Sequence, residues 1–132
     1  MADVDAREEI RAAFDDVVDA QNSGDAARLR LALSGRADAV HIGTDPGEWW
    51  TSADLVTAMG NLGDDGVRVV TDDLGVHVAG DVGWVEGRGR FTHPGGAERP
   101  ARFTAVLTRE DGRWRVVQSH ASIGFPNEEM FG

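Results

Sequence analysis

Apolar residues in the first part of the chain recur at the spacing of an amphipathic helix. One helical face contains Ile10, Ala13, Phe14, Val17, Val18 and Gln21. Asp5 followed by Glu8 resembles a capping box, and Gly24 is typical of a helix stop. The pattern therefore predicts a helix from about Ala6 to Ser23.

Two shorter helices and one strand are predicted in the next segment of the chain. Asp25 is in position to cap a helix that continues through Leu33. Ser52 is in position to cap a third helix, which the pattern ends at Gly60. Between these two helices, Ala39–Gly43 has the composition of a short strand.

From Val67 onward the pattern changes to β-branched and aromatic residues separated by turn residues. Turns are predicted at 80–81, 93–96 and 111–112, which gives four long strands in meander order. Strands this long must bend, and the glycines of the second one mark where: Gly83, Gly87 and Gly89. The elements together predict an α+β fold in a single domain over residues 1–132. In this fold about three helices pack on a strongly curved antiparallel sheet of about five to six strands.

The dipeptide Asp111-Gly112 predicts a register, because a two-residue type I′ turn favours it and fixes the pairing of the flanking strands. Counting outward from this turn pairs Ala105 with Gln118 and Phe103 with His120. Strand alternation then places these four side chains on the apolar face that meets the helices. The sequence therefore predicts that Gln118 and His120 line an internal pocket beside Phe103.

The preceding strand presents four larger side chains on one of its sides: Trp84, Glu86, Arg88 and Arg90. The turn after this strand is long, so its register depends on an assumption about that turn. If Thr92 lies opposite Ala101, Arg88 falls in the same row as Gln118. In that register Glu86 and Arg88 reach the pocket, and polar groups converge on an apolar wall.

Composition narrows the location and the partners of the chain. It has 132 residues, 41% of them hydrophobic, and a formal net charge of -10, which disfavours nucleic acid and anionic membrane surfaces. No apolar run approaches the ~20 residues that a membrane span requires. The N-terminus lacks the pattern of a secretion signal, and the chain has no cysteine, so a cytoplasmic location is expected.

The residue inventory also excludes several mechanisms. The chain contains no lysine, cysteine or tyrosine, which removes Schiff-base chemistry, thiolate attack and phenol proton donation. Acid-base chemistry must rest on the four histidines, the carboxylates, or hydroxyl and arginine assistance. Neither Asp64-Asp65 nor Asp72-Asp73 has the spacing of a metal-binding loop, so no metal and no cofactor are expected.

Each candidate site residue has a structural alternative. His120 is either a general base or ligand donor, or a core histidine bound to its neighbours. Glu86 and Arg88 either face the pocket or form an ion pair on the sheet. The pair Trp49-Trp50 is either a pocket lid or a dimer contact, and His41 points to the face opposite its two apolar neighbours, where a pocket role is open.

Two segments resemble the SnoaL-like members of the nuclear-transport-factor-2-like superfamily. They are Trp114-Arg115-Val116-Val117-Gln118-Ser119-His120-Ala121-Ser122 and His41-Ile42-Gly43-Thr44-Asp45-Pro46-Gly47-Glu48-Trp49-Trp50. The order of the predicted elements extends the resemblance over essentially the whole chain. It implies a cone-shaped α+β barrel, with a cavity between the helices and the concave sheet, in a protein that commonly forms dimers through that sheet.

The last strand is also similar to that of the association domain of calcium/calmodulin-dependent protein kinase II, at Trp114, Val117, His120 and Ser122. The chain departs from that domain at Gln118, where the domain has histidine, and at Glu86, where it has a pocket arginine. Catalytic members of the superfamily such as ketosteroid isomerase use pocket tyrosines, and this chain has none.

Two functions follow as hypotheses. In the first, the protein binds a small apolar or aromatic molecule, with or without acid-base turnover by His120 and Glu86. The predicted ligand-binding residues are Trp84, Arg88, Phe103, Gln118, His41 and Trp50. In the second, the chain is a homodimeric association module without catalysis, because the other face of the sheet is mixed rather than fully polar.

Overall fold

The computed structural model, which describes residues 2–62 and 66–132, contains a helical layer and a sheet. The helices are α1 (Ala2–Ser23), α2 (Ala26–Ala32), α3 (Ser52–Leu62) and a short 3₁₀ helix (Asn127–Glu129). The strands are β1 (Val40–Ile42), β2 (Trp49–Trp50), β3 (Arg68–Ala79), β4 (Val82–Thr92), β5 (Glu98–Glu110) and β6 (Arg113–Ser122). The predicted α+β class and the four long meander strands are confirmed.

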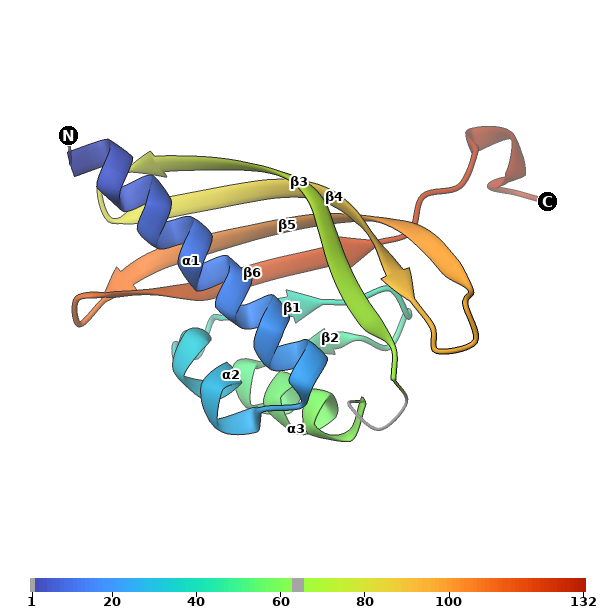
Figure 1. The fold of residues 1–132 in the computed structure, drawn as a ribbon, viewed down its shortest axis with the longest axis horizontal. Helices are drawn as coiled ribbons and strands as arrows, with labels where there is room; N and C mark the ends of the chain where they lie inside the picture. Colours follow the sequence, from blue (N-terminus) through green and yellow to red (C-terminus); the bar gives the residue numbers. More distant parts are fainter. Residues whose placement is uncertain (1, 63–65) are drawn as a thin grey trace.

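One sheet contains these strands in the order β2-β1-β6-β5-β4-β3. Neighbouring strands are antiparallel, except that β1 runs parallel to β6 with His41 opposite Ser119. The sheet is therefore mixed, which the prediction of a purely antiparallel sheet missed. The strands β2 and β3 form its two edges, so the sheet curls around the helices without closing (Figure 1).

Helix α1 crosses the inner face of the sheet (Figure 1). Helix α2 packs against α1 and β6, and α3 lies beside α2, β1 and β2. The predicted apolar face of α1 is confirmed, because Ile10, Phe14 and Val17 are buried in one cluster with Val85 and Leu107 of the sheet. Burying each such side chain contributes about 1.5–3 kcal/mol of transfer free energy. This contact fixes the helical layer on the sheet and sets the floor of the site described below.

Three helix ends differ from the prediction: the start of α1 and both ends of α3. Helix α1 begins at Ala2 rather than at about Ala6, so Asp5 lies inside the helix and does not cap it. The cap of α3 is Thr51, whose Oγ1 accepts a hydrogen bond of 3.1 Å from the Asp54 N–H, and not Ser52. The hydroxyl of Ser52 is instead donated to the Ser34 carbonyl, 2.6 Å away. The same helix continues past Gly60 to Leu62, because a glycine inside the last turn weakens a helix without ending it. The predicted cap of α2 is confirmed, since Asp25 accepts from the Arg28 N–H.

The hairpin between β5 and β6 begins as predicted and then changes register. Asp111 and Gly112 have φ values of 52° and 77°, as a type I′ turn requires, and Leu107 lies opposite Val116. Beyond that pair the register shifts by one residue at Val117, which is a β-bulge in β6. The prediction counted straight through this point.

The bulge reverses the faces of the last five residues of β6. Gln118 lies opposite Val106, and His120 lies opposite Thr104, so the predicted pairing of Phe103 with His120 is wrong. Gln118 and His120 are exposed on the outer face of the sheet, and their places on the inner face are taken by Ser119 and Ala121. A shift of one residue exchanges the two faces because strand side chains alternate.

The register of β4 against β5 also differs from the assumed one. Thr92 lies opposite Glu98, because β5 begins three residues earlier than assumed and includes Pro100. An odd shift again exchanges the faces. As a result Glu86 and Arg88 are exposed on the outer face.

The predicted bend at the glycines of β4 has a clear physical basis at Gly89. A Cβ added to Gly89 would lie 1.9 Å from the carbonyl oxygen of Val70 on β3, so no other residue fits without movement of β3. The ladder between these strands is irregular nearby, between Thr71 and Asp73. Figure 1 shows that β3 and β4 both curve along their length and wrap the helical layer.

Over the part of the chain that the structure describes, no helix combines the length and the apolar character needed to cross a membrane.

Candidate functional site

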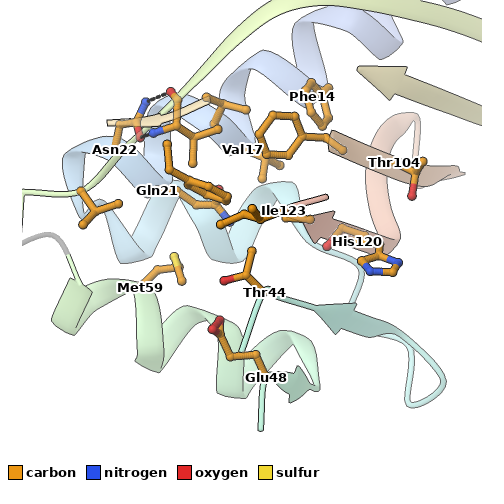
Figure 2. A pocket seen from close by; sticks show the side chains of 17 residues that line it. Phe14, Val17, Gln21, Asn22, Thr44, Glu48, Met59, Thr104, His120 and Ile123 are labelled. Carbon is orange, nitrogen blue, oxygen red and sulfur yellow. Dashed lines mark hydrogen bonds between the residues drawn. The ribbon is translucent and has the colours of Figure 1, made fainter. Parts of the chain in front are cut away.

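A largely apolar pocket lies between the helices and the inner face of the sheet (Figure 2). Its volume is about 350 Å³, which lies within the ~300–1,000 Å³ of small-molecule sites. Ten of its lining residues are apolar: Phe14, Val17, Val18, Met59, Val67, Val69, Phe91, Phe103, Ala121 and Ile123. Seven are polar: Gln21, Asn22, Thr44, Glu48, Thr104, Ser119 and His120.

The sheet side of the pocket contains an aromatic pair. The rings of Phe91 and Phe103 lie 5.8 Å apart at 75°, an edge-to-face arrangement that stabilises both rings. Phe103 is buried and belongs to the main core cluster, so this wall is continuous with the core. The two rings give this side of the pocket an apolar, aromatic surface.

One end of the pocket is formed by Asn22 in the last turn of α1. Its Nδ2 donates to the carbonyl oxygen of Val69, 2.9 Å away, and its Oδ1 accepts from the Val69 N–H over 2.8 Å. Both hydrogen bonds join the end of α1 to β3. The amide of Asn22 is thereby fixed, and the neighbouring half-buried Gln21 lines the pocket beside it.

A chain of hydrogen bonds runs behind the pocket wall through His41. Its Nδ1 contacts Ser119 Oγ at 2.8 Å, and its Nε2 contacts Ser52 Oγ at 3.0 Å. The Ser52 hydroxyl is donated to the Ser34 carbonyl oxygen. Ser119 lines the pocket, so this chain links the cavity to the buried junction of β1, α2 and α3.

The environment of His41 keeps its imidazole neutral. The residue is 1% exposed, and burial lowers the pKa of His41 to about 4 because the charged ring cannot be hydrated. A base with so low a pKa is a weak proton acceptor near neutral pH. The contact between Ser119 and His41 therefore orients the Ser119 hydroxyl group, and near neutral pH the imidazole is only a weak base toward it.

The loop between β1 and β2 contributes Thr44 and Glu48 to the opposite end of the pocket from Asn22 (Figure 2). Oε1 of Glu48 accepts from the Asp45 N–H at 3.0 Å, which folds the side chain back over its own loop. A Cβ on Gly43 would lie 2.3 Å from Oε2 of Glu48, so the absence of a side chain there leaves space for the carboxylate.

The predicted catalytic and ligand-binding residues lie in the pocket wall, behind it, at its border or on the outer face of the sheet. Phe103 lines the pocket as predicted. His41 is buried behind the pocket wall, and Trp50 is half-buried against the core on β2, opposite His41. His120 borders the pocket, but its side chain is exposed and its ring points away from the apolar centre, as does the hydroxyl of Thr104 (Figure 2).

The other predicted site residues form part of the outer face of the sheet. Nε2 of His77 lies 2.9 Å from both carboxylate oxygens of Glu86, and the His77 ring stacks on Trp84 with the centroids 5.5 Å apart. Gly75 opposite Glu86 leaves room for this carboxylate. The expected convergence of Trp84, Glu86, Arg88 and Gln118 on the pocket is thus not found, because both register predictions were off by an odd number of residues.

Residues 10–126 match the SnoaL-like domain family. The chain belongs to the SnoaL-like family. This match confirms the resemblance seen in the sequence, and it includes every strand of the sheet and every residue that lines the pocket. No curated protein sequence matches the chain.

Several solved structures share the fold of this SnoaL-like chain at low sequence identity. A nuclear-transport-factor-2-like protein of unknown function from Pseudomonas putida has a TM-score of 0.81 at 19% identity, covering 95% of this chain and 91% of its own. A putative dehydratase of that family from Streptomyces avermitilis gives 0.75 at 20%, covering 92% and 97%. A putative calcium/calmodulin-dependent protein kinase II association domain from Xanthomonas campestris gives 0.74 at 22%, covering 90% and 87%. Identities this low establish the fold alone.

Several pocket residues of the SnoaL-like chain were missed from sequence. Gln21 carried a usable signal, because it is a polar residue on the otherwise apolar face of α1. Glu48 and Thr44 lie in a loop without periodicity, and Ser119 was assigned to the wrong face by the bulge. Across residues 2–62 and 66–132, no group of three or more histidine, aspartate or glutamate side chains is placed to hold a metal ion.

Proposed function

We propose that this SnoaL-like protein binds one small, largely apolar or aromatic molecule in the pocket between α1, α3 and the inner face of the sheet. The observation that carries the proposal is a cavity of about 350 Å³ whose wall is mainly apolar and contains a few polar groups. Such a cavity is the usual composition of a ligand site. The Phe91–Phe103 pair gives it a rigid aromatic wall.

The proposal is binding and not acid-base turnover by the predicted pair. Glu86 is on the outer face and bound to His77, and the ring of His120 points away from the cavity. A general base must come within hydrogen-bonding distance of the proton that it removes. Glu86 does not meet that requirement for a molecule in the pocket. His120 lines the pocket, but its ring is turned away from the apolar centre.

A fluorescence titration of the full chain with 2-methoxynaphthalene tests the proposal. We expect saturable binding of one molecule per chain. Ala121→Phe should abolish it, because Ala121 lines the pocket and a phenyl group there would fill the space. Ala79→Phe, at an exposed position at the end of β3, is the matched control and should bind as the wild type does. Equal binding by both variants would place the probe outside the pocket.

A second candidate function is homodimeric association through the outer face of the sheet. Trp84 and Val82 are each 41% exposed there, beside half-buried Val106. Exposed apolar patches of this kind mark interaction surfaces. Ile123 and Ala121 line the pocket, so they do not add to this patch. The Xanthomonas neighbour described as an association domain makes a self-association role reasonable.

A further inference from the structure

The hydrogen-bond chain behind the pocket fixes the direction of each proton in it. The Ser34 carbonyl oxygen can only accept, so the single hydroxyl proton of Ser52 is donated to it over 2.6 Å. Ser52 Oγ must then accept at its other contact, which is Nε2 of His41 at 3.0 Å. The N–H of His41 therefore lies on Nε2.

A neutral imidazole has only one N–H, so Nδ1 of His41 is an acceptor. The ring is neutral because it is buried and because both of its hydrogen-bonding partners are hydroxyl groups rather than carboxylates. Nδ1 thus takes the proton of Ser119, 2.8 Å away. With its own proton committed, Ser119 can offer the pocket only lone pairs.

The charges of the lining residues disfavour an anionic ligand. Glu48 lines the pocket with a carboxylate, which accepts hydrogen bonds and repels anions. No arginine occurs among the lining residues in the described parts of the chain, and the ring of His120 points away from the apolar centre (Figure 2). A ligand carboxylate or phosphate entering this cavity would lose its hydration without gaining a partner of opposite charge.

We infer that the pocket selects a neutral or cationic ligand that donates a hydrogen bond, from a hydroxyl or an N–H group, to Ser119. This inference rests on the proposed function and names the class of molecule that the pocket takes. The amide of Gln21 lines the same cavity and can both donate and accept, so it serves a further polar group of the ligand. Ser52 and His41 act as positioning residues, because they set which way the Ser119 hydroxyl points.

Three naphthalene probes of similar shape test the inference with the full chain at pH 7: 2-naphthol, 2-methoxynaphthalene and 2-naphthoate. The first donates a hydrogen bond, the second cannot, and the third is an anion. We expect the naphthol to bind about tenfold more tightly than its methyl ether, which is the effect of one hydrogen bond. The naphthoate should bind most weakly.

Two variants assign these preferences to residues. In Ser119→Ala the ratio of naphthol to methyl-ether affinity should fall to about one, because the acceptor is gone. In Glu48→Gln the affinity for the naphthoate should rise relative to that for the naphthol, because the like charge is gone. Equal affinities of the wild type for the naphthol and its ether, or tightest binding of the naphthoate, would overturn the inference and leave the proposed pocket in place. Failure of all three probes to bind would overturn both.

The tautomer of His41 can be measured directly. The nitrogen-15 spectrum of labelled His41 should show an N–H on Nε2 and an acceptor at Nδ1, whether or not Ser119→Ala folds. Ser52→Ala removes the group that fixes this tautomer from a position outside the pocket lining. Mixed tautomers and a naphthol-to-ether ratio closer to one are expected in that variant. A wild-type spectrum with the N–H on Nδ1 would contradict the assignment of Ser119 as an acceptor.

Discussion

At the scale of single residues, His41 connects the site to the stability of the whole chain. It is 1% exposed, and its folded pKa of about 4 lies below the ordinary value of 6.5 because the charged ring is desolvated. Between these two values the unfolded chain binds a proton that the folded chain does not. The free energy of unfolding therefore falls as the pH is lowered through this range. Above pH 6.5 His41 is neutral in both states and causes no such loss.

We predict that His41 alone lowers the free energy of unfolding by about 3 kcal/mol between pH 6.5 and about pH 4. Denaturant titrations at a series of pH values measure this dependence. His41→Gln should lack that part of it, because an amide does not titrate in this range. The variant should also be less stable at pH 7 by about 1–3 kcal/mol, since the hydroxyls of Ser52 and Ser119 lose their partner.

The matched control for this prediction is His93→Gln. His93 is exposed in the turn between β4 and β5, where its Nδ1 accepts from the Gly95 N–H. Its replacement should leave the pH dependence of the wild type intact. A His41→Gln variant with the same slope as the wild type would show that the imidazole titrates normally in the folded chain.

The local pattern predicted some site residues and could not predict others. Phe103 could be placed, because alternation along β5 continues unbroken from the turn at 111–112. The contacts of His41 could not, because they depend on the parallel pairing of a three-residue strand with β6, and Ser119 lies 78 positions away. Nothing near His41 in the sequence specifies that neighbour.

At the scale of elements, the type I′ turn and the bulge of β6 differ in what specifies them. The turn needs two positive φ angles, and Asp111-Gly112 supplies them locally. The bulge at Val117 has no glycine or other local sequence signal, and it lies in a strand that pairs with β5 on one side and with β1 on the other. The fold was therefore predictable from the pattern, whereas the face carrying each residue after Val117 was not.

A second element-scale feature is the close approach of β3 to β4 at Gly89. We predict that Gly89→Ala lowers the free energy of unfolding by about 1–3 kcal/mol, because the new methyl group would displace the backbone of β3 at Val70. Gly35→Ala is the control, since a Cβ there meets no atom within 4 Å. Urea unfolding of the two variants measures the difference, and equal stabilities would show that β3 moves at negligible cost.

At the scale of the whole molecule, the outer face of the sheet carries exposed apolar side chains, among them Trp84 and Val82. We predict a homodimer in which Trp84 and Val82 are covered by the second chain. Trp84→Arg should weaken the dimer at least about tenfold, because a buried tryptophan commonly dominates an interface. Sedimentation velocity over a range of concentrations measures the dissociation constant of each variant.

Leu31→Arg is the control for this experiment. Leu31 is 50% exposed on α2, in the helical layer rather than on the outer face of the sheet. The substitution adds the same charge to a comparably exposed apolar position, and it should leave the dissociation constant unchanged. A wild-type chain that stays monomeric at micromolar concentration would rule out the dimer itself.

The clamp between Asn22 and Val69 has a consequence for aggregation. β3 is an edge strand, and open edges offer unpaired N–H and C=O groups to the strands of other molecules. The N–H and the C=O of Val69 both point away from β4, since both bind the side-chain amide of Asn22. One side chain of α1 thus imitates a neighbouring strand at this point. It blocks the pairing of an incoming strand at Val69, near the start of β3, and so protects this part of the edge from a growing ladder of strands.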